Sequence, residues 1–392
     1  MYSGTADLSV YFIELALRLL KPNGHLCYIT TNKFFSNEFG KPVRRIILSN
    51  SITHLVNFEQ VEVFENVLVS SVILGITSHA AKENKFIYQQ FFKLNNEQIK
   101  NDFEDKQNSF GSFEQSNLDE SEWSFATGAS AELKRKLDAF PRLGKLEGVH
   151  IYRGVTTGYN PAFIITNEQR DKLIAEDPKN AEIIKNMLQG RNIRKWFYNE
   201  SEENLLQTGY DMDIEKVYPH IYQHLLQFEQ DLVARTDQGK KWYNLRACQY
   251  YGEFEKSEKI IWGLTATNWA YTLDTGRHYL PSNGYILTSE ILPVRFILGL
   301  LNSKVLHQYF KYIGVMTAGG AYTLKAATIE AMPIPDSTPE QRQAIINIVN
   351  TILDAKKQDP TTDVAMEEQQ IDELVYNLFG LTDEEKELIE QS

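Results

Sequence analysis

Several features that would assign a chemistry to this chain directly are missing from its sequence. Its 392 residues include two cysteines, Cys27 and Cys248, which lie far apart and lack the spacing of a metal or redox site. Cys27 falls in an apolar run typical of a strand, so we expect a buried, reduced thiol there. Histidine, cysteine and acidic residues nowhere cluster with metal-ligand spacing. The sequence therefore predicts neither a disulfide framework nor a metal centre.

The glycine-rich motifs of nucleotide-binding and hydrolytic enzymes are also absent. Neither G-x-G-x-x-G nor G-x-x-x-x-G-K-[ST] occurs, and there is no G-x-S-x-G. The single Gly-Gly pair lies in TAGGAY, residues 317–322, outside any strand–turn–helix pattern, which favours a turn over a phosphate loop. Judged by motifs alone, the chain has no complete active site.

Long apolar runs and targeting signals are missing as well. No run reaches the roughly 20 residues of a membrane-spanning helix, and no basic segment followed by an apolar one marks a signal peptide. Hydrophobic residues make up 42% of the chain and aromatic residues 12%, which is typical of a globular protein. We therefore expect a cytoplasmic protein of two or three domains.

Negative charge is present but unevenly distributed. The formal net charge is −12, and between Asp336 and Ser392 there are 14 acidic residues against 4 basic ones. Residues 145–335 contain 21 residues of each sign. A neutral segment of this kind can still present one basic face to a phosphate backbone. The net charge thus neither excludes DNA nor supports it.

The N-terminal quarter alternates between helical and strand patterns. Residues 7–20 carry an apolar stripe at helical spacing, and Pro22, Asn23 and Gly24 end that helix. The next run, residues 25–31, predicts an internal strand of a parallel sheet. We expect a further helix at 39–50 and strands at 52–59, 67–77 and 85–94. This alternation predicts an α/β fold with a doubly wound sheet, whose last strands form an antiparallel hairpin at its edge.

Composition divides the chain into four segments. Residues 1–95 contain the predicted sheet, and residues 96–130 are polar and acidic, as in a linker or a solvated crossing. Residues 131–335 form a mixed α+β region, which begins with a helix at 131–140 and whose aromatic residues predict core packing. Residues 336–392 are acidic, with amphipathic helices at 338–356 and 364–379.

At this point several stretches resemble a known family. TADLSVYFIELALRLLKPNGHLCYITTNKFF resembles the segment that follows the Asn-Pro-Pro-Tyr motif in adenine-specific DNA methyltransferases of type IIG restriction-modification enzymes. VNFEQVEVFENVLVSSVILGI is similar to that family's later strand–loop–strand. YRGVTTGYNPAFII, LQGRNIRKWF, LLNSKVLHQYF and IEAMPIP resemble its target-recognition domain, and IDELVYNLFGLTDEEKELIE its C-terminal helices. The resemblance covers nearly the whole chain.

The resemblance implies a partial, Rossmann-like methyltransferase sheet followed by a DNA reader. In the family, the S-adenosylmethionine loop and the Asn-Pro-Pro-Tyr motif lie upstream of the segment that matches here, and neither occurs in this sequence. We therefore expect residues 1–95 to be the C-terminal half of a methyltransferase domain. Double-stranded DNA is the implied partner. S-adenosylmethionine is the implied cofactor of the complete enzyme, not bound by this chain alone, and a second polypeptide would carry the missing half. We expect no catalytic residue in this chain.

Three residues are candidates for a flipped-base pocket. In the family, an aromatic residue at the position of Phe64 packs against the flipped adenine, and such stacking contributes roughly 1–3 kcal/mol per base. The alternative is a core phenylalanine that closes the sheet edge. Asn32 and Lys33 end the first strand, where crevice residues of doubly wound sheets lie. Asp7 is the expected N-cap of the first helix.

The target-recognition segment supplies the candidates for DNA binding. Arg153 has the geometry to bind a guanine edge or a phosphate, and basic residues interleaved with aromatic ones suit a face that follows the backbone. Turn formation and a solvated surface are the competing explanations. The candidates are Arg153, Thr156, Thr157, Tyr159, Asn160, Arg191, Arg194, Lys195, Lys240 and Lys241, with Arg235 and Arg246 as further basic residues.

Three hypotheses follow. The first is the C-terminal part of a site-specific adenine methyltransferase, which supplies sequence-specific DNA binding and part of the base pocket. The second is a stand-alone specificity subunit completed by another polypeptide. The third is a module that binds a protein instead of DNA. A nuclease role is the weakest option, because the sequence offers no convincing Asp…Glu-x-Lys constellation and because, in the fused enzymes of the family it resembles, that activity lies in a separate N-terminal region. The recognised DNA sequence does not follow from the residues alone.

Overall fold

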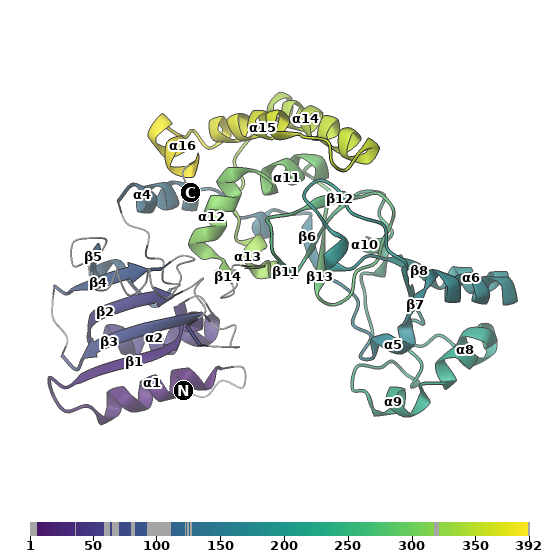
Figure 1. The fold of residues 1–392 in the computed structure, drawn as a ribbon, viewed down its shortest axis with the longest axis horizontal. Helices are drawn as coiled ribbons and strands as arrows, with labels where there is room; N and C mark the ends of the chain where they lie inside the picture. The colour runs from purple at the N-terminus through teal and green to yellow at the C-terminus, as the bar shows by residue number, and fades with distance from the viewer. Residues whose placement is uncertain are drawn as a thin grey trace. The chain divides into compact units, whose positions relative to one another are not determined.

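The computed structural model describes the chain apart from residues 1–5, 36, 59–62, 65–69, 80–82, 92–110, 122, 124, 126–127, 317–320 and 391–392. The chain divides into two compact units, each with its own contacts. The N-terminal unit comprises Met1–Ala139, Gln308–Thr323 and Glu387–Ser392, and the C-terminal unit comprises Phe140–His307 and Leu324–Lys386. Figure 1 labels the elements of both units.

A five-stranded sheet forms the centre of the N-terminal unit, with the strand order β1-β3-β2-β4-β5. Strand β3 pairs antiparallel with both β1 and β2, β2 pairs parallel with β4, and β5 pairs antiparallel with β4. Strands β1, β2 and β4 therefore run in one direction, so their C-terminal ends share an edge of the sheet. The strands are β1 (His25–Thr31), β2 (Ser51–Phe58), β3 (Ser71–Thr77), β4 (Lys85–Gln90) and β5 (Gly111–Glu114).

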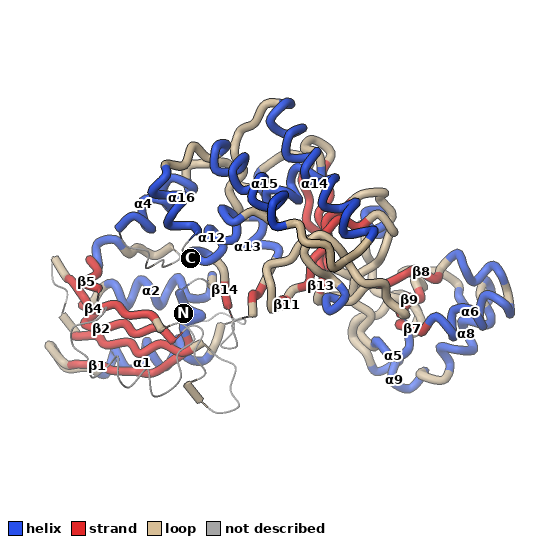
Figure 2. Tube along the Cα trace, turned by 45° about the horizontal axis from the view of Figure 1, so that its top comes forward, coloured by secondary structure: helices blue, strands red, loops and turns tan. Residues whose placement is uncertain are grey.

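Two helices, α1 (Leu8–Leu19) and α2 (Lys41–Leu48), pack on one face of this sheet. Figure 2 shows the strands in red with these helices beside them. As predicted, Asp7 is the N-cap of α1 and accepts a hydrogen bond from the Ser9 amide at 3.0 Å. The buried side of α1 consists of Val10, Ile13 and Leu17. The helices and strands predicted from the apolar spacing are thus present.

The position of β3 differs from the prediction. We expected the last strands to form a hairpin at the sheet edge, but β3 lies between β1 and β2. Among the described strands, β1 has β3 as its single neighbour, so it is neither internal nor part of a parallel pair. Cys27 is also exposed, not buried as predicted. Alternation along the strand puts Cys27 on the face opposite Leu26, which packs in the core that contains α1.

Part of the predicted linker also belongs to the sheet. Residues 111–114, which composition placed in a solvated crossing, form β5 and pair with β4. Phe113, Leu118 and Trp123 are buried in the core beneath α1 and α2. Composition did not reveal these residues, because they are isolated apolar positions in a segment that is polar on average. The other elements with residues in this unit are η1 (Asn32–Phe35), η2 (Glu38–Gly40), η3 (Gln115–Asn117), α4 (Gly128–Asp138), α12 (Lys304–Ile313), β14 (Val315–Met316), β15 (Tyr322–Thr323) and α16 (Asp383–Glu390).

The C-terminal unit contains two antiparallel sheets. The larger has the order β12-β10-β13-β6 and the smaller has the order β7-β9-β8. Their strands are β6 (Val149–Arg153), β7 (Ile164–Thr166), β8 (Ile184–Met187), β9 (Glu203–Leu206), β10 (Lys259–Gly263), β12 (Thr272–Asp274) and β13 (Gly284–Ser289). Short elements connect them: η4 (Leu143–Lys145), α5 (Asn160–Phe163), α6 (Asn167–Glu176), η5 (Pro178–Glu182), η6 (Gly190–Asn192), α7 (Ile214–Val217), α8 (Pro219–Leu226), α9 (Glu229–Ala234), α10 (Tyr251–Phe254), β11 (Thr265–Ala266), α11 (Val294–Leu301) and α13 (Ala326–Glu330).

Aromatic residues form much of this unit's interior, as predicted. Trp262 and Tyr271 are fully buried, and Trp262 stacks on Tyr285 with ring centroids 5.5 Å apart. The indole N–H of Trp262 donates to the carbonyl of Leu324 at 3.0 Å. Because a buried indole N–H needs an acceptor, this bond fixes the ring in one orientation.

Two long helices complete the C-terminal unit, α14 (Pro339–Gln358) and α15 (Ala365–Leu378). Both were predicted from their apolar spacing. Thr338 and Gln341 form a capping box at the start of α14. Helix α14 packs on α11, where Gly299 allows close approach, since a Cβ there would lie 2.6 Å from Ile345. None of the helices in the described part of the chain has the length and apolarity that a bilayer crossing requires.

Candidate nucleic-acid interface

Polar side chains gather where β1 and β2 end. Asn32 follows β1 and Asn57 lies near the end of β2; both are buried, and the Asn32 amide donates to Oδ1 of Asn57 at 3.1 Å. The Asn32 backbone N–H donates to the carbonyl of Ser70 at 3.1 Å. The amide of Gln89, near the end of β4, is also buried and its Oε1 has no hydrogen-bond partner. The buried Asn32 side chain thus links the C-terminal ends of β1 and β2.

Lys33 lies on the exposed side of the same edge. Its Nζ is 3.7 Å from Oδ2 of Asp7, and about half of the Lys33 side chain is exposed. The backbone hydrogen bond from Ser9 lowers the pKa of Asp7, and the nearby Lys33 charge lowers it further. Lys33 is therefore an accessible cation at the carboxyl edge of the sheet, held by the residue that caps α1.

Phe64 is exposed. Its side chain is 47% accessible to solvent, whereas the adjacent Val63 packs against the small cluster of Val56, Phe58 and Phe91. A core phenylalanine would be almost fully buried. The exposure therefore argues against the packing alternative and leaves an aromatic face available. Glu62, Glu65 and Asn66, which flank it in the sequence, lie outside the described residues.

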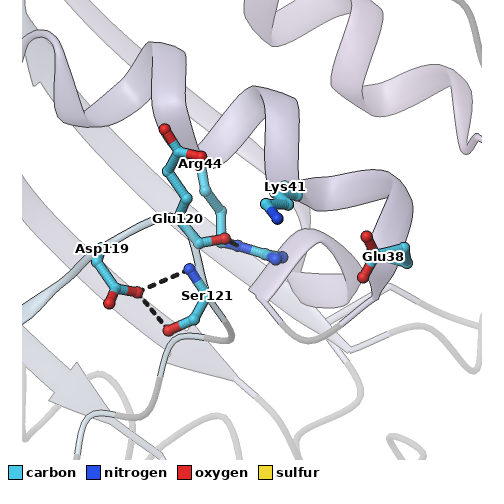
Figure 3. A pocket seen from close by; sticks show the side chains of 6 residues that line it. All are labelled: Glu38, Lys41, Arg44, Asp119, Glu120 and Ser121. Carbon is cyan, nitrogen blue, oxygen red and sulfur yellow. Dashed lines mark hydrogen bonds between the residues drawn. The ribbon is translucent and has the colours of Figure 1, made fainter.

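Figure 3 shows the residues that line a hollow in the N-terminal unit, whose charged side chains stabilise the fold and do not form a ligand site. The hollow has a volume of about 450 Å³. Arg44, one of its lining residues, is buried and donates to the carbonyls of Phe34, Phe35, Asn37 and Glu120 at 2.6 to 3.2 Å. Since Arg44 already has carbonyl acceptors, it holds this part of the chain together. The lining contains three carboxylates and two cations, which does not favour a phosphate: Glu38, Lys41, Arg44, Asp119, Glu120 and Ser121.

In the C-terminal unit, the predicted segment 153–160 joins β6 to α5. Gly154 approaches the chain at Pro281 so closely that a Cβ would lie 2.0 Å from its carbonyl oxygen, and Gly158 has a φ of +71°. Both glycines therefore shape the turn, as the alternative explanation proposed. Arg153 is exposed and donates from Nε to the carbonyl of Ser282 at 2.5 Å.

The polar residues of this segment divide into outer and inner ones. Asn160 is exposed and Thr156 is half-buried. Thr157 is buried and donates to Oδ1 of Asn160 at 2.5 Å. Tyr159 donates to Asp231 at 3.0 Å, and this bond raises the pKa of its hydroxyl. Thr157 and Tyr159 thus position the turn, while Asn160 faces solvent.

Arg235 fastens the second predicted basic segment to this turn. It is buried, lies over the ring of Phe163, and donates to the carbonyls of Thr157, Trp242 and Asn244. Burial lowers the pKa of this guanidinium to about 10. Arg235 therefore stabilises the fold and is not available to phosphate, contrary to its proposed role as a further basic contact.

The neighbouring cations are exposed and paired with carboxylates. Lys240 is 3.2 Å from Asp211, Lys241 is 3.3 Å from Asp213, and Arg246 is 3.1 Å from Asp237. A hydrogen bond with Tyr243, followed by one with Asp213, raises the pKa of Lys241. Surface pairs of this kind contribute only about 0–1 kcal/mol. They therefore do not prevent the lysines from exchanging a carboxylate for a phosphate.

The segment 191–195 lies beside the ends of β9 and α15. Arg191 pairs with Glu203 at 2.6 Å, and Lys195 pairs with Glu368 of α15 at 2.7 Å. Arg194 is exposed, and its guanidinium donates to the carbonyls of Arg191 and Ile193 at 2.7 and 2.9 Å. Arg194 thus has no carboxylate within ion-pair distance among the described residues, unlike its two neighbours.

Arg277 is a further exposed cation, and the sequence motifs did not single it out. Arg277 has a φ of +57°, a left-handed conformation that is unusual for a residue with a side chain. No hydrogen bond, ion pair or ring contact joins its side chain to another described residue. A Gly-Arg pair in a turn, directly after a strand, is the signal that would have identified it.

The turn that carries Arg277 is fixed by Asp274. This buried carboxylate accepts hydrogen bonds from the Gly276 and His278 amides at 2.8 and 2.9 Å and from Lys259 Nζ at 2.5 Å. The side chains of Lys259 and Asp274 are both completely buried. Although burial opposes ionisation, the bond with His278 and the Lys259 charge lower the pKa of Asp274. These bonds therefore fix the backbone of the turn on both sides of Arg277.

The described residues do not fit S-adenosylmethionine. A nucleotide cofactor of a doubly wound sheet sits on a glycine-rich turn that leads from a strand into a helix. Here β1 runs directly into η1, and Asn32 at this junction is bonded to Asn57. We derive no chemical step through this cofactor. Equally, no group of three or more histidine, cysteine or acidic side chains in the described part of the chain is arranged to hold a metal ion.

Two segments of the chain match known family models. Residues 1–64 match the Eco57I restriction-modification methylase family, and residues 185–334 match the TaqI-like C-terminal specificity domain. The chain is similar to the type II restriction enzyme and methyltransferase RM.Eco57I of Escherichia coli, with 22% identity over 437 residues. That alignment covers 97% of this chain but 43% of the relative, so the chain spans less than half of the relative's length.

Solved structures share the fold at low sequence identity. The type IIL restriction-modification enzyme MmeI, solved in complex with DNA, superposes with a TM-score of 0.66 and 14% identity, covering 96% of this chain and 50% of MmeI. A nuclease-deletion mutant of the type ISP enzyme LlaGI, solved with a DNA substrate mimic, gives a TM-score of 0.52 at 10% identity, covering 90% of this chain and 31% of LlaGI. The chain thus has the fold of one part of these larger proteins.

Proposed function

We propose that this chain, which carries an Eco57I-type methylase segment and a TaqI-like specificity domain, is the C-terminal, DNA-reading part of a type II restriction-modification methyltransferase. The observation that carries the proposal is the match of residues 185–334 to a specificity domain. That range contains Arg191, Arg194, Lys195, Lys240, Lys241 and Arg277, six exposed or half-exposed cations. The relatives solved with DNA support duplex DNA as the ligand.

The proposed DNA contacts follow from exposure. Arg153, Asn160 and Arg194 face solvent and are suited to direct contact with bases or phosphates. Thr156 is a weaker candidate, and Thr157 and Tyr159 contribute by holding the turn. The paired cations Arg191, Lys195, Lys240 and Lys241 would exchange their carboxylates for phosphates. Such contacts release counterions, so affinity would fall steeply with salt.

The N-terminal unit would supply one side of the base pocket. Strands β1, β2 and β4 run in one direction beneath α1 and α2, which supports a partial, Rossmann-like methyltransferase sheet. Phe64 would stack on a flipped adenine, with Asn32 and Lys33 on the rim. The exposed ring of Phe64 supports this role.

Methyl transfer would require residues that this sequence does not contain. S-adenosylmethionine would donate the methyl group in the complete enzyme. We propose that a polypeptide segment with a glycine-rich loop and an Asn-Pro-Pro-Tyr motif completes the site, and that this chain alone transfers no methyl group. DNA as the substrate would place the protein in the cytoplasm.

Two measurements on the purified chain test the proposal. Fluorescence anisotropy with labelled duplexes should detect binding at low salt, and a radiolabelled S-adenosylmethionine assay should detect no methylation of DNA. Failure to bind any duplex would favour the alternative of a protein-interaction module. Methylation by the chain alone would contradict the claim that the site is incomplete.

A further inference from the structure

Helix α1 has a second apolar face, directed away from the sheet. Leu8, Phe12, Leu15 and Leu19 are spaced by four, three and four residues, so they align along one side of the helix. Each is between 52% and 74% exposed. The opposite side of the helix contacts the sheet core through Val10, Ile13 and Leu17. A helix that is apolar on both sides is typical of one that is buried in a larger structure.

Strand β1, next to α1, has an edge that is not protected against pairing. In the described sheet it has β3 as a neighbour on one side. Edge strands that end a sheet usually carry lysine, proline or a bulge, because bare edges recruit other strands. The sequence of β1, HLCYITT, contains no Lys, Arg, Asp, Glu or Pro. Ile29 on this strand is also 48% exposed.

The two features concentrate exposed apolar surface at one end of the sheet. Ten large hydrophobic side chains are exposed in the described part of the chain, and five of them lie on α1 and β1. Leu8, Phe12, Leu15 and Leu19 lie on the outer side of α1, whereas Ile29, like Cys27, lies on the sheet face that α1 does not cover. Exposed apolar residues therefore occur on both sides of β1, and large exposed apolar areas mark interaction sites. The required partner presents both a strand edge and an apolar helix or helical layer.

We infer that this α1–β1 face docks a polypeptide segment carrying the remaining strands and helices of the methyltransferase domain. The inference rests on the proposed function. Both elements fall inside residues 1–64, which match a methylase family. The E. coli relative has more than half of its length outside the alignment, enough to supply such a segment. The face is uncharged apart from an intrahelical pair of Arg18 with Glu14, so apolar burial and strand pairing are the main contributions to binding.

The first experiment identifies the occupant. The affinity-tagged full chain is expressed in its own cells, and the captured proteins are sequenced. The inference expects a polypeptide that carries both a glycine-rich loop and an Asn-Pro-Pro-Tyr motif. A source genome that encodes no such polypeptide, or a stoichiometric partner without these motifs, overturns it. Sedimentation of the chain alone tests the second occupant: a stable homodimer that Phe12→Asp dissociates would mean that a second copy covers the face.

The second experiment tests the face itself. The purified partner is titrated with the native chain and with the Phe12→Asp/Leu15→Asp variant, which should weaken binding by about 100-fold or more, as for anchor residues of an interface. Val233→Asp changes an equally exposed apolar residue of the C-terminal unit and should leave the affinity unchanged. Equal affinity of the native chain and the α1 variant overturns the inference.

Amide hydrogen exchange of the native chain tests the same interface without a substitution, in case the Phe12→Asp/Leu15→Asp variant misfolds. In the native chain, partner binding should slow amide exchange in β1, since its free edge then donates to a new strand. Unchanged exchange in β1 overturns the inference. Duplex affinity separates this inference from the proposed function, because the α1 variant should bind DNA as the native chain does. Lost DNA binding in the native chain with intact partner docking would refute the proposed function alone.

Discussion

The indole N–H of Trp196 donates to Oε1 of Glu368 at 2.5 Å, although 172 positions of sequence separate the two residues. Lys195 Nζ lies 2.7 Å from the same oxygen, and Trp196 itself is buried with a φ of +73°. A single carboxylate of α15 therefore holds the segment 191–196 in place. The C-terminal helices thus shape part of the proposed DNA-binding surface.

Replacing Glu368 should loosen that segment. Glu368→Ala leaves the buried indole N–H without an acceptor, so we expect a loss of about 1–3 kcal/mol in the free energy of unfolding. Glu368→Gln keeps an acceptor and removes the exchangeable ion pair, which contributes only about 0–1 kcal/mol. Urea unfolding of both variants provides the comparison. Equal losses in the two variants would show that the hydrogen bond with Trp196 does not matter.

The buried pair of Lys259 and Asp274 should be among the most sensitive sites of the C-terminal unit. Asp274→Asn leaves the Lys259 ammonium buried without its counter-charge, which costs about 3–5 kcal/mol. The matched control is Asp171→Asn, which breaks an exposed pair with Arg170 and should cost less than about 0.5 kcal/mol. Thermal or urea unfolding measures both, and a mild Asp274→Asn phenotype would contradict the assigned role.

The same pair predicts a pH dependence with a definite sign. Because the folded-state pKa of Asp274 is lowered, its stabilising effect is present above the unfolded pKa of about 3.9 and is lost as the pH falls through the folded value. The difference in unfolding free energy between the native chain and Asp274→Asn should therefore be constant from about pH 5 to 7 and shrink below about pH 4. Denaturant titrations across this range provide the test. A difference that grows on acidification would have the wrong sign.

The Arg277 side chain should lower the free energy of unfolding but strengthen the binding of duplex DNA. Glycine adopts a φ of +57° without strain, so Arg277→Gly should raise the unfolding free energy or leave it unchanged, with a gain of up to about 1 kcal/mol. The same change removes an exposed guanidinium from the specificity domain and should weaken duplex binding. Unfolding and anisotropy measurements on one preparation test both effects. Loss of stability without any change in DNA affinity would assign Arg277 a purely structural role.

Arg194 should contact phosphate more directly than its paired neighbours. Arg194→Ala should reduce the slope of log affinity against log salt by about one unit. Lys172→Ala, an exposed change on α6 outside the matched specificity range, provides the control and should leave the slope unaltered. Equal slopes for all three proteins would remove Arg194 from the interface.

The local elements of the fold were predictable because they depend on apolar spacing. The helix that Asp7 caps, the strand that begins at His25 and the two C-terminal helices were predicted close to their observed bounds. The position of β3 between β1 and β2 was not, since strand order depends on pairing between distant residues. Cys27 was misassigned because its exposure depends on whether another element covers its face of the sheet, which an apolar run in the sequence does not reveal.

In the candidate site, too, local features were predictable from sequence and tertiary contacts were not. Exposed residues in glycine-bounded turns, such as Arg153 and Asn160, were found from sequence. Arg235 looked equally basic but is buried beneath the turn at Thr157, a contact between residues far apart in the sequence. Lys195 looked free but pairs with Glu368. Sequence therefore identifies which side chains are charged, and the tertiary structure decides which charges reach solvent.

The central claim is that this chain reads DNA sequence, and selection from a random duplex library tests it most directly. The purified chain is incubated with the library over several rounds at rising salt, and the bound duplexes are sequenced. We expect enrichment of one short site, with affinity at least about 1,000-fold above that for random duplex. Binding without any enriched site, or no binding even at low salt, would contradict it.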